Sequence, residues 1–157
     1  MKKVMFVCTG NICRSAMAHH YLEKRVHDLS KENEIYVSSC GTSALEGDVS
    51  TPNAIEVMKK YGVDLRAHRA KDMFNADIET FDIILCMTQR HKYNLLAYFP
   101  KLKDKVFTLK EYVLGQDIKN VDIDDPWGYG IKIYEDCASQ IVDCVDKLLE
   151  KIIKEVE

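Results

Sequence analysis

The chain has 157 residues, of which 46% are hydrophobic and 30% are charged, and its formal net charge is −3. This length and composition predict one globular domain, residues 1–157, with a single sizeable core. The negative net charge argues against a nucleic-acid partner, because phosphates require clustered lysines and arginines. No apolar run is long enough for a signal peptide or for the roughly 18 residues of a membrane span, so we expect a cytoplasmic protein without a membrane partner.

Runs of β-branched and aromatic residues alternate along the chain with segments whose apolar residues recur at the helical period. Strands are predicted at residues 2–8, 34–39, 81–87 and 105–109. Helices are predicted at residues 15–33, 52–61 and 88–99, and a long closing helix carries an apolar stripe from Tyr134 to Ile152. This alternation predicts an α/β fold, a four-stranded parallel sheet with helices on both faces, as in Rossmann-like domains. Ligands bind such sheets beyond the carboxyl ends of the strands.

The first predicted strand runs into the sequence Cys-Thr-Gly-Asn-Ile-Cys-Arg-Ser, residues 8–15, which leads into the first helix. Backbone N–H groups at a helix N-terminus bind tetrahedral oxyanions. We therefore expect a phosphate-binding loop made of Thr9, Gly10, Asn11, Ile12, Cys13, Arg14 and Ser15. Gly10 and Asn11 are best able to adopt left-handed backbone conformations, and the Arg14 guanidinium is a planar fork suited to two phosphate oxygens. Ser15 is expected to cap the helix.

Six cysteines are present, and in a reducing compartment we expect their thiols to be free. The close pairs, Cys8/Cys13 and Cys137/Cys144, lack the CxxC spacing of zinc sites, so no metal and no other cofactor is expected. Cys8 differs from the others because the amides, helix end and Arg14 guanidinium that bind an anion also stabilise a thiolate. We interpret Cys8 as a nucleophile. The alternative is a buried strand end followed by an ordinary turn.

An acid is needed to protonate the oxygen that leaves phosphorus, and the candidate lies far along the chain. Asp125 precedes Pro126, whose ring restricts the aspartate to extended conformations and stiffens the loop. On the residues alone, a turn with solvated carboxylates is the simpler interpretation. Trp127 follows at once, either as a ring-stacking wall for an aromatic substrate or as an anchor for the loop.

The residues from Cys8 to Ser15, together with Asp125-Pro126 near the C-terminus, resemble the low-molecular-weight protein tyrosine phosphatases over essentially the whole chain. The resemblance implies hydrolysis of phosphotyrosine in proteins, and of small aryl phosphates, through a phosphocysteine intermediate. It implies that Cys8 is the nucleophile, Arg14 the phosphate ligand and Asp125 the general acid. Inorganic phosphate and other oxyanions are expected as product or inhibitors, and we expect a monomer.

Further roles follow from the same resemblance. His68 resembles the histidine that hydrogen-bonds the loop asparagine, here Asn11, and Ser39 occupies the place of another loop-bracing hydroxyl. Trp127 and Leu45 resemble the two walls of the substrate cleft. Cys13 resembles the second loop cysteine, which forms a reversible disulfide with the nucleophile and shields it from overoxidation.

Three other functions stay open on the same scaffold. Protein-arginine phosphatases tend to carry threonine where this loop has Ile12, so Ile12 favours phosphotyrosine. Thioredoxin-coupled arsenate reductases need two further relay cysteines; Cys86 could be one, but Tyr93 stands where the other is expected. A non-catalytic phosphate-binding module would be favoured had Cys8 or Asp125 been replaced. The remaining histidines, on predicted helices at spacings typical of solvated faces, are given no role: His19, His20, His27 and His91.

Overall fold

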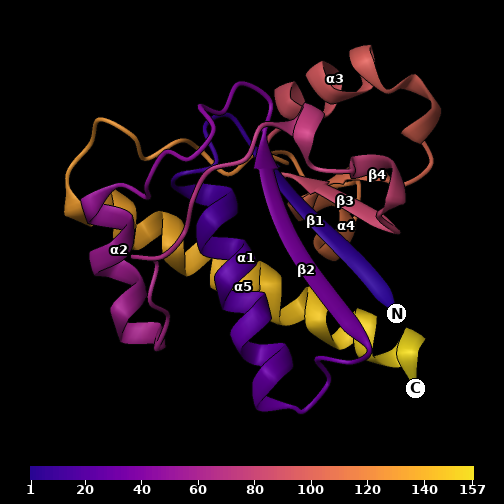
Figure 1. Cartoon of the computed structure of the whole chain (residues 1–157), viewed down its shortest axis with the longest axis horizontal. Helices are drawn as coiled ribbons and strands as arrows, with labels where there is room; N and C mark the ends of the chain where they lie inside the picture. The colour runs from indigo at the N-terminus through magenta and orange to yellow at the C-terminus, as the bar shows by residue number, and fades with distance from the viewer.

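The sheet has the predicted form. The computed structural model describes all residues, 1–157. Its four strands are β1 (Lys2–Cys8), β2 (Ile35–Gly41), β3 (Ile83–Cys86) and β4 (Val106–Thr108). Every neighbouring pair is parallel, in the order β2-β1-β3-β4 (Figure 1). The four-stranded parallel sheet expected from the sequence is confirmed.

Five α-helices connect and cover these strands. They are α1 (Arg14–Asp28), α2 (Pro52–Met58), α3 (Gln89–Tyr98), α4 (Leu109–Leu114) and α5 (Ile131–Val156). The predicted second helix is shorter than expected, because it tightens into a 3₁₀ turn and stops at Gly62 with φ 74°. Helix α4 was not predicted; Thr108 and Glu111 cap it in a reciprocal pair that lets a six-residue helix form.

Two hydrophobic clusters lie on opposite faces of the sheet. Successive side chains of a strand point to opposite faces, so Val4 and Phe6 join the larger cluster, while Met5 and Val7 join the smaller one. The larger cluster packs against α1, α2 and α5, which gather on one side of the sheet in Figure 1. Helix α3 lies on the other side. The expected cover of helices on both faces is therefore confirmed.

The strand order places a natural binding position at the end of β1. After β1 the chain crosses to β2 on one side, and it later returns to β3 on the other side, so the connections diverge beside β1. Open α/β sheets bind ligands at such a point, beyond the carboxyl ends of the strands. The residues 8–15 begin there. None of the helices has the length and apolar character needed to cross a membrane.

Candidate active site

The backbone of the loop between β1 and α1 turns at Asn11. Asn11 has φ 56°, in the left-handed region, whereas Gly10 does not, so the expectation for Gly10 was wrong. The Asn11 side chain is completely buried and stabilises this turn. Its Nδ2 donates to Ser15 Oγ over 2.7 Å, and its Oδ1 accepts from the backbone N–H of Lys71 over 3.0 Å. Asparagine suits the position because it tolerates this conformation and supplies both a donor and an acceptor.

Neighbouring segments hold the loop from outside. His68 Nε2 donates to the backbone carbonyl of Asn11 over 2.7 Å, so the predicted contact between these two residues is present. The N–H of Thr42 donates to the Cys8 carbonyl over 2.9 Å, and the segment after β2 thereby runs directly against the loop. Gly41 permits this approach, since a Cβ there would collide with the Thr9 carbonyl. The sequence analysis did not single out Gly41.

The Cys8 thiol faces two hydrogen-bond donors. The N–H of Asn11 lies 3.3 Å from Cys8 Sγ and donates to it. Ser15 Oγ accepts from Asn11 Nδ2, and its own proton can be donated to the same sulfur, 2.9 Å away, or to the more distant Cys40 carbonyl at 3.5 Å. Donors aimed at the sulfur stabilise a thiolate. The predicted capping role of Ser15 is wrong, since the helix N-cap is Cys13, which makes no side-chain cap bond.

The Arg14 guanidinium is fixed beside this thiol. Only 4% of the residue is exposed, and one terminal nitrogen donates to the carbonyl of Ile123 over 2.9 Å. The other terminal nitrogen lies 3.6 Å from Asp125 Oδ2. Its Nε–H is buried and has no acceptor in the protein. A buried donor without a partner is costly, so this side chain is prepared for an anionic ligand.

A cavity of about 260 Å³ opens over the loop. Its walls are formed by Cys8, Thr9, Gly10, Ile12, Cys13, Arg14, Asp125 and Trp127. Asp125 is half exposed at the mouth, and its Oδ1 accepts from the N–H of Trp127 over 3.0 Å. The Trp127 side chain is also exposed, as a stacking wall would be. Leu45 is 73% exposed and does not line the cavity. The expectation that Leu45 forms its second wall is therefore wrong for this structure.

The comparisons with known proteins agree with this geometry. The family model described as low molecular weight phosphotyrosine protein phosphatase matches residues 3–157. The chain belongs to this family. A protein-arginine-phosphatase of Geobacillus stearothermophilus is 37% identical to this chain, and the alignment covers 96% of this chain and 95% of the relative. A low molecular weight phosphotyrosine protein phosphatase of Gallus gallus is 35% identical, with 96% of each chain covered.

The fold comparison gives the same family. The crystal structure of a low molecular weight protein tyrosine phosphatase from T. tengcongensis matches with a TM-score of 0.87 and 37% sequence identity. It covers 96% of this phosphatase and 99% of the other chain. The chain is therefore a phosphomonoester hydrolase of the low molecular weight class, and both tyrosine and arginine phosphatases are found among its relatives.

His91 is a member of the site that sequence reasoning missed. It is buried rather than solvated, and its Nδ1 accepts the N–H of Thr88 over 3.1 Å in the cap of α3. The proton therefore sits on Nε2, which donates to Thr9 Oγ1 over 2.8 Å. Burial lowers the pKa of His91 to about 4, and the nearby Arg14 cation adds to this effect. The signal in the sequence was His91 three residues after Thr88, a capping-box spacing.

Of the other histidines predicted on solvated faces, one is exposed and two are largely covered. His27 is exposed, as predicted for a solvated face. His19 and His20 are largely covered, and both lie close to His68, so the expectation of solvated side chains was wrong for them. The Ser39 hydroxyl makes no hydrogen bond to residues 8–15 of the phosphatase; it is hydrogen-bonded to His19 Nδ1 over 2.7 Å. The bracing role predicted for Ser39 is thus at most indirect, through this group of histidines.

The remaining thiols are all free and buried. Cys13 Sγ lies 3.4 Å from the Tyr134 hydroxyl and 3.5 Å from that of Thr51, and burial raises the pKa of this thiol. Cys86 is completely buried in the smaller cluster, and burial raises the pKa of Cys86 well above the ordinary value. Neither environment favours a thiolate, in contrast to the donors around Cys8.

Proposed function

We propose that this phosphatase hydrolyses phosphotyrosine in proteins, and small aryl phosphates, through a phosphocysteine intermediate. The observation that carries the proposal is the convergence of Cys8, Arg14 and Asp125 on one cavity whose outer wall is Trp127. A thiol with two donors, a buried cation with an unpartnered N–H and a carboxylate at the mouth are the groups that phosphoryl transfer from an aryl ester requires.

In the first step the Cys8 thiolate attacks phosphorus, a sulfur–phosphorus bond forms, and the bond from phosphorus to the phenol oxygen breaks. The amides of the residues 9–14 and the Arg14 guanidinium hold the three non-bridging oxygens, and Asp125 gives its proton to the leaving phenolate. In the second step water attacks the phosphocysteine, Asp125 takes a proton from that water, and Ser15 donates to the departing thiolate. Inorganic phosphate leaves as product and competes with substrate for the same loop.

Cys13 has a protective role in this proposal. Oxidation of the Cys8 thiolate by a peroxide gives a sulfenic acid, and attack by the Cys13 thiol releases water and forms a disulfide. A thiol reductant restores both groups. The Cys13 thiol is held by Tyr134 and Thr51 and has a raised pKa, which leaves Cys8 as the first thiol to be oxidised.

A protein-arginine phosphatase is the second candidate, favoured by the relative from Geobacillus stearothermophilus. Arginine would bring a guanidinium cation into the cavity, where Asp125 is the single carboxylate of the wall and already faces Arg14. A phenol ring instead needs apolar surface, which Ile12 and Trp127 provide. An arsenate reductase is less favoured, because the buried Cys86 is poorly placed to act as a relay thiol.

The test is a side-by-side assay of kcat/KM on matched phosphotyrosine and phosphoarginine peptides, with arsenate plus thioredoxin as a third arm. We expect the phosphotyrosine peptide to dominate, and Ile12→Thr to shift the ratio toward phosphoarginine. Cys8→Ser should abolish turnover and still bind phosphate. A dominant phosphoarginine rate in the wild-type protein would overturn the substrate assignment, whereas full activity of Cys8→Ser would overturn the mechanism.

A further inference from the structure

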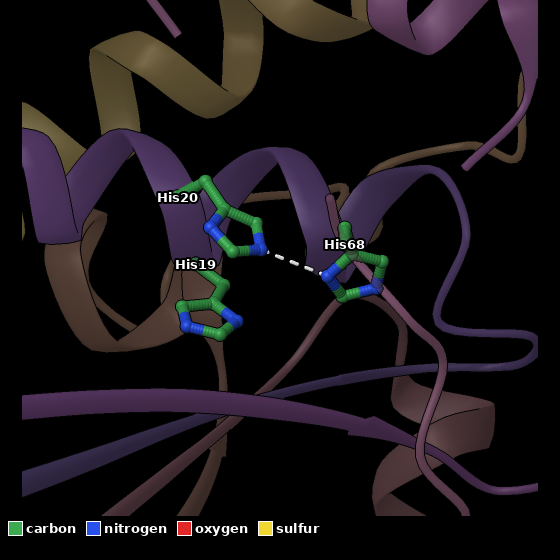
Figure 2. Close-up of side chains that lie close together, drawn as sticks. All are labelled: His19, His20 and His68. Carbon is green, nitrogen blue, oxygen red and sulfur yellow. Dashed lines mark hydrogen bonds between the residues drawn. The ribbon is translucent and has the colours of Figure 1, made fainter. Parts of the chain in front are cut away.

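Three imidazoles lie together behind the active-site loop, outside the catalytic cavity. His19 and His20 are adjacent on α1, and His68 belongs to the segment that follows α2 (Figure 2). One nitrogen atom of each ring lies within 4.8 Å of the other two. The His19 and His20 rings are stacked with centroids 4.0 Å apart, and His20 Nε2 lies 2.8 Å from His68 Nδ1.

The hydrogen bonds fix the state of His68. Its Nε2 faces the Asn11 carbonyl, which only accepts, so Nε2 carries the proton. In the neutral ring, Nδ1 then has a free lone pair directed toward His20. Burial lowers the pKa of His68 to about 4, which keeps the ring neutral. An imidazole whose outer nitrogen donates to a backbone carbonyl and whose inner nitrogen is free has the arrangement of a metal ligand.

The other two rings have outer partners of the same kind. His20 Nδ1 lies 3.5 Å from Glu23 Oε1. His19 is held on both sides, with Nδ1 2.7 Å from Ser39 Oγ and Nε2 3.5 Å from Glu23 Oε2. Either His19 nitrogen can therefore turn inward while the other keeps a partner. Carboxylates, hydroxyls and carbonyls in these positions orient metal-bound histidines.

We propose that His19, His20 and His68 bind a divalent transition metal of the zinc class. Zinc–nitrogen bonds of 2.0–2.1 Å place neighbouring ligand nitrogens about 3.3 Å apart in a tetrahedron. The nitrogens already lie within 4.8 Å of one another, and the stacked His19 and His20 rings must rotate apart about their side-chain bonds to direct both lone pairs at one ion. The fourth position is open to water or to a Glu23 oxygen. When the metal enters, His20 changes tautomer: the proton on Nε2 leaves for solvent, Nδ1 takes up a proton from solvent and donates it to Glu23, and the ring stays neutral with no electron transferred.

Charge and access are compatible with a bound cation. Lys71 and Arg69 are the cations that act on the histidines, and they favour the neutral imidazoles that bind metal. Glu23 supplies the compensating negative charge, since its hydrogen bonds with His19 and His20 lower the pKa of this carboxyl. His20 and Glu23 line a surface cavity of about 460 Å³, which gives a path from solvent.

A metal at this position would act on the active site through His68. It would hold the ring in the tautomer that donates to the Asn11 carbonyl, and Asn11 is the left-handed residue on which the loop turns. The metal would therefore brace the loop without touching substrate. The sequence gives no sign of this site. His19 and His20 are adjacent, His68 follows 48 residues after His20, and this spacing matches no metal-binding motif, so only the fold brings the three together.

The test is a Zn²⁺ titration followed by calorimetry, on full-length protein carrying Cys8→Ser and Cys13→Ser so that the active-site thiols cannot bind the metal. We expect one Zn²⁺ per chain and a rise in Tm with Zn²⁺. Adding His20→Gln or His19→Gln should weaken binding at least about tenfold and remove the Tm rise. His27→Gln, on the exposed side of the same helix, is the matched control and should bind as tightly as its parent.

Co²⁺ identifies the ligands independently of affinity. The same parent, with Cys8→Ser and Cys13→Ser, should show with Co²⁺ the visible bands of nitrogen and oxygen coordination without a sulfur-to-cobalt charge-transfer band. Circular dichroism checks that each variant is folded. If one of the two histidine variants does not fold, the other is enough for the test. The proposal is overturned if the parent with Cys8→Ser and Cys13→Ser binds no stoichiometric Zn²⁺, or if His19→Gln and His20→Gln bind as that parent does. Neither result bears on the phosphatase assay.

Discussion

His91 Nε2 donates a 2.8 Å hydrogen bond to Thr9 Oγ1 and so joins the start of α3 to the loop that follows Cys8. The same ring accepts the N–H of Thr88 within the cap of α3. Both bonds require the neutral ring with its proton on Nε2. One side chain thus supports a helix start and a wall residue of the active site, provided that it stays unprotonated.

This requirement makes stability depend on pH. The pKa of His91 is about 4 in the folded protein and 6.5 in its ordinary state, so below pH 6.5 the unfolded chain takes up the proton first. The contribution of neutral His91 to the free energy of unfolding is complete above pH 6.5 and is lost as the pH falls toward 4. Between pH 7 and pH 5 the loss is about 2 kcal/mol. His68, with a pKa of about 4, adds a loss of the same sign.

Urea unfolding of wild type and His91→Gln at pH 7 and pH 5 measures this effect. Gln keeps a side-chain donor but does not titrate, so the variant should lose less stability between the two pH values than the wild type. Arg14, Asp122, Asp125 and Arg90 also face His91, and they are unchanged in both proteins. Equal pH dependence in the two proteins would refute the role of His91.

Asp125→Asn tests the proposed general acid. Asparagine keeps the size and the acceptor for the Trp127 N–H but has no proton to give, so kcat should fall by roughly 10²–10⁴ for poor leaving groups. The loss should shrink for phenols that leave readily without protonation. The measurement is kcat over a series of aryl phosphates of increasing phenol pKa. Asp124→Asn, one residue away, is the matched control, and an equal loss in that variant would contradict the assignment.

Asn11 allows backbone strain to be separated from hydrogen bonding. Asn11→Gly and Asn11→Ala both lose the bonds to Ser15 and Lys71, but only alanine is strained at φ 56°. We expect the alanine variant to be less stable than the glycine variant by about 1 kcal/mol in urea unfolding. Both should have reduced kcat. If alanine is as stable as glycine, the loop does not keep its left-handed turn in solution.

The placement of residues 8–15 at the end of β1 could be predicted from the sequence because these residues are neighbours along the chain. Residues 8–15 are contiguous, and a strand followed by a helix is enough to place their amides at an anion-binding position. The alternation of strands and helices likewise predicted the parallel sheet, since parallel strands need such crossovers. The errors within this segment, at Gly10 and Ser15, concern single torsions and bonds that the spacing of residues does not specify.

The contacts between distant segments were decided by the tertiary structure alone. His91 was assigned to a solvated face, yet the packing of α3 beside the end of β1 buries it and turns it to Thr9. His19, His20 and His68 looked unrelated for the same reason. Periodicity shows that a helix has a polar face, but not which neighbouring segment covers that face. In this protein the sequence by itself determined the sheet and the position of residues 8–15 between β1 and α1, and the packing of α1 and α3 decided which histidines lie near that loop.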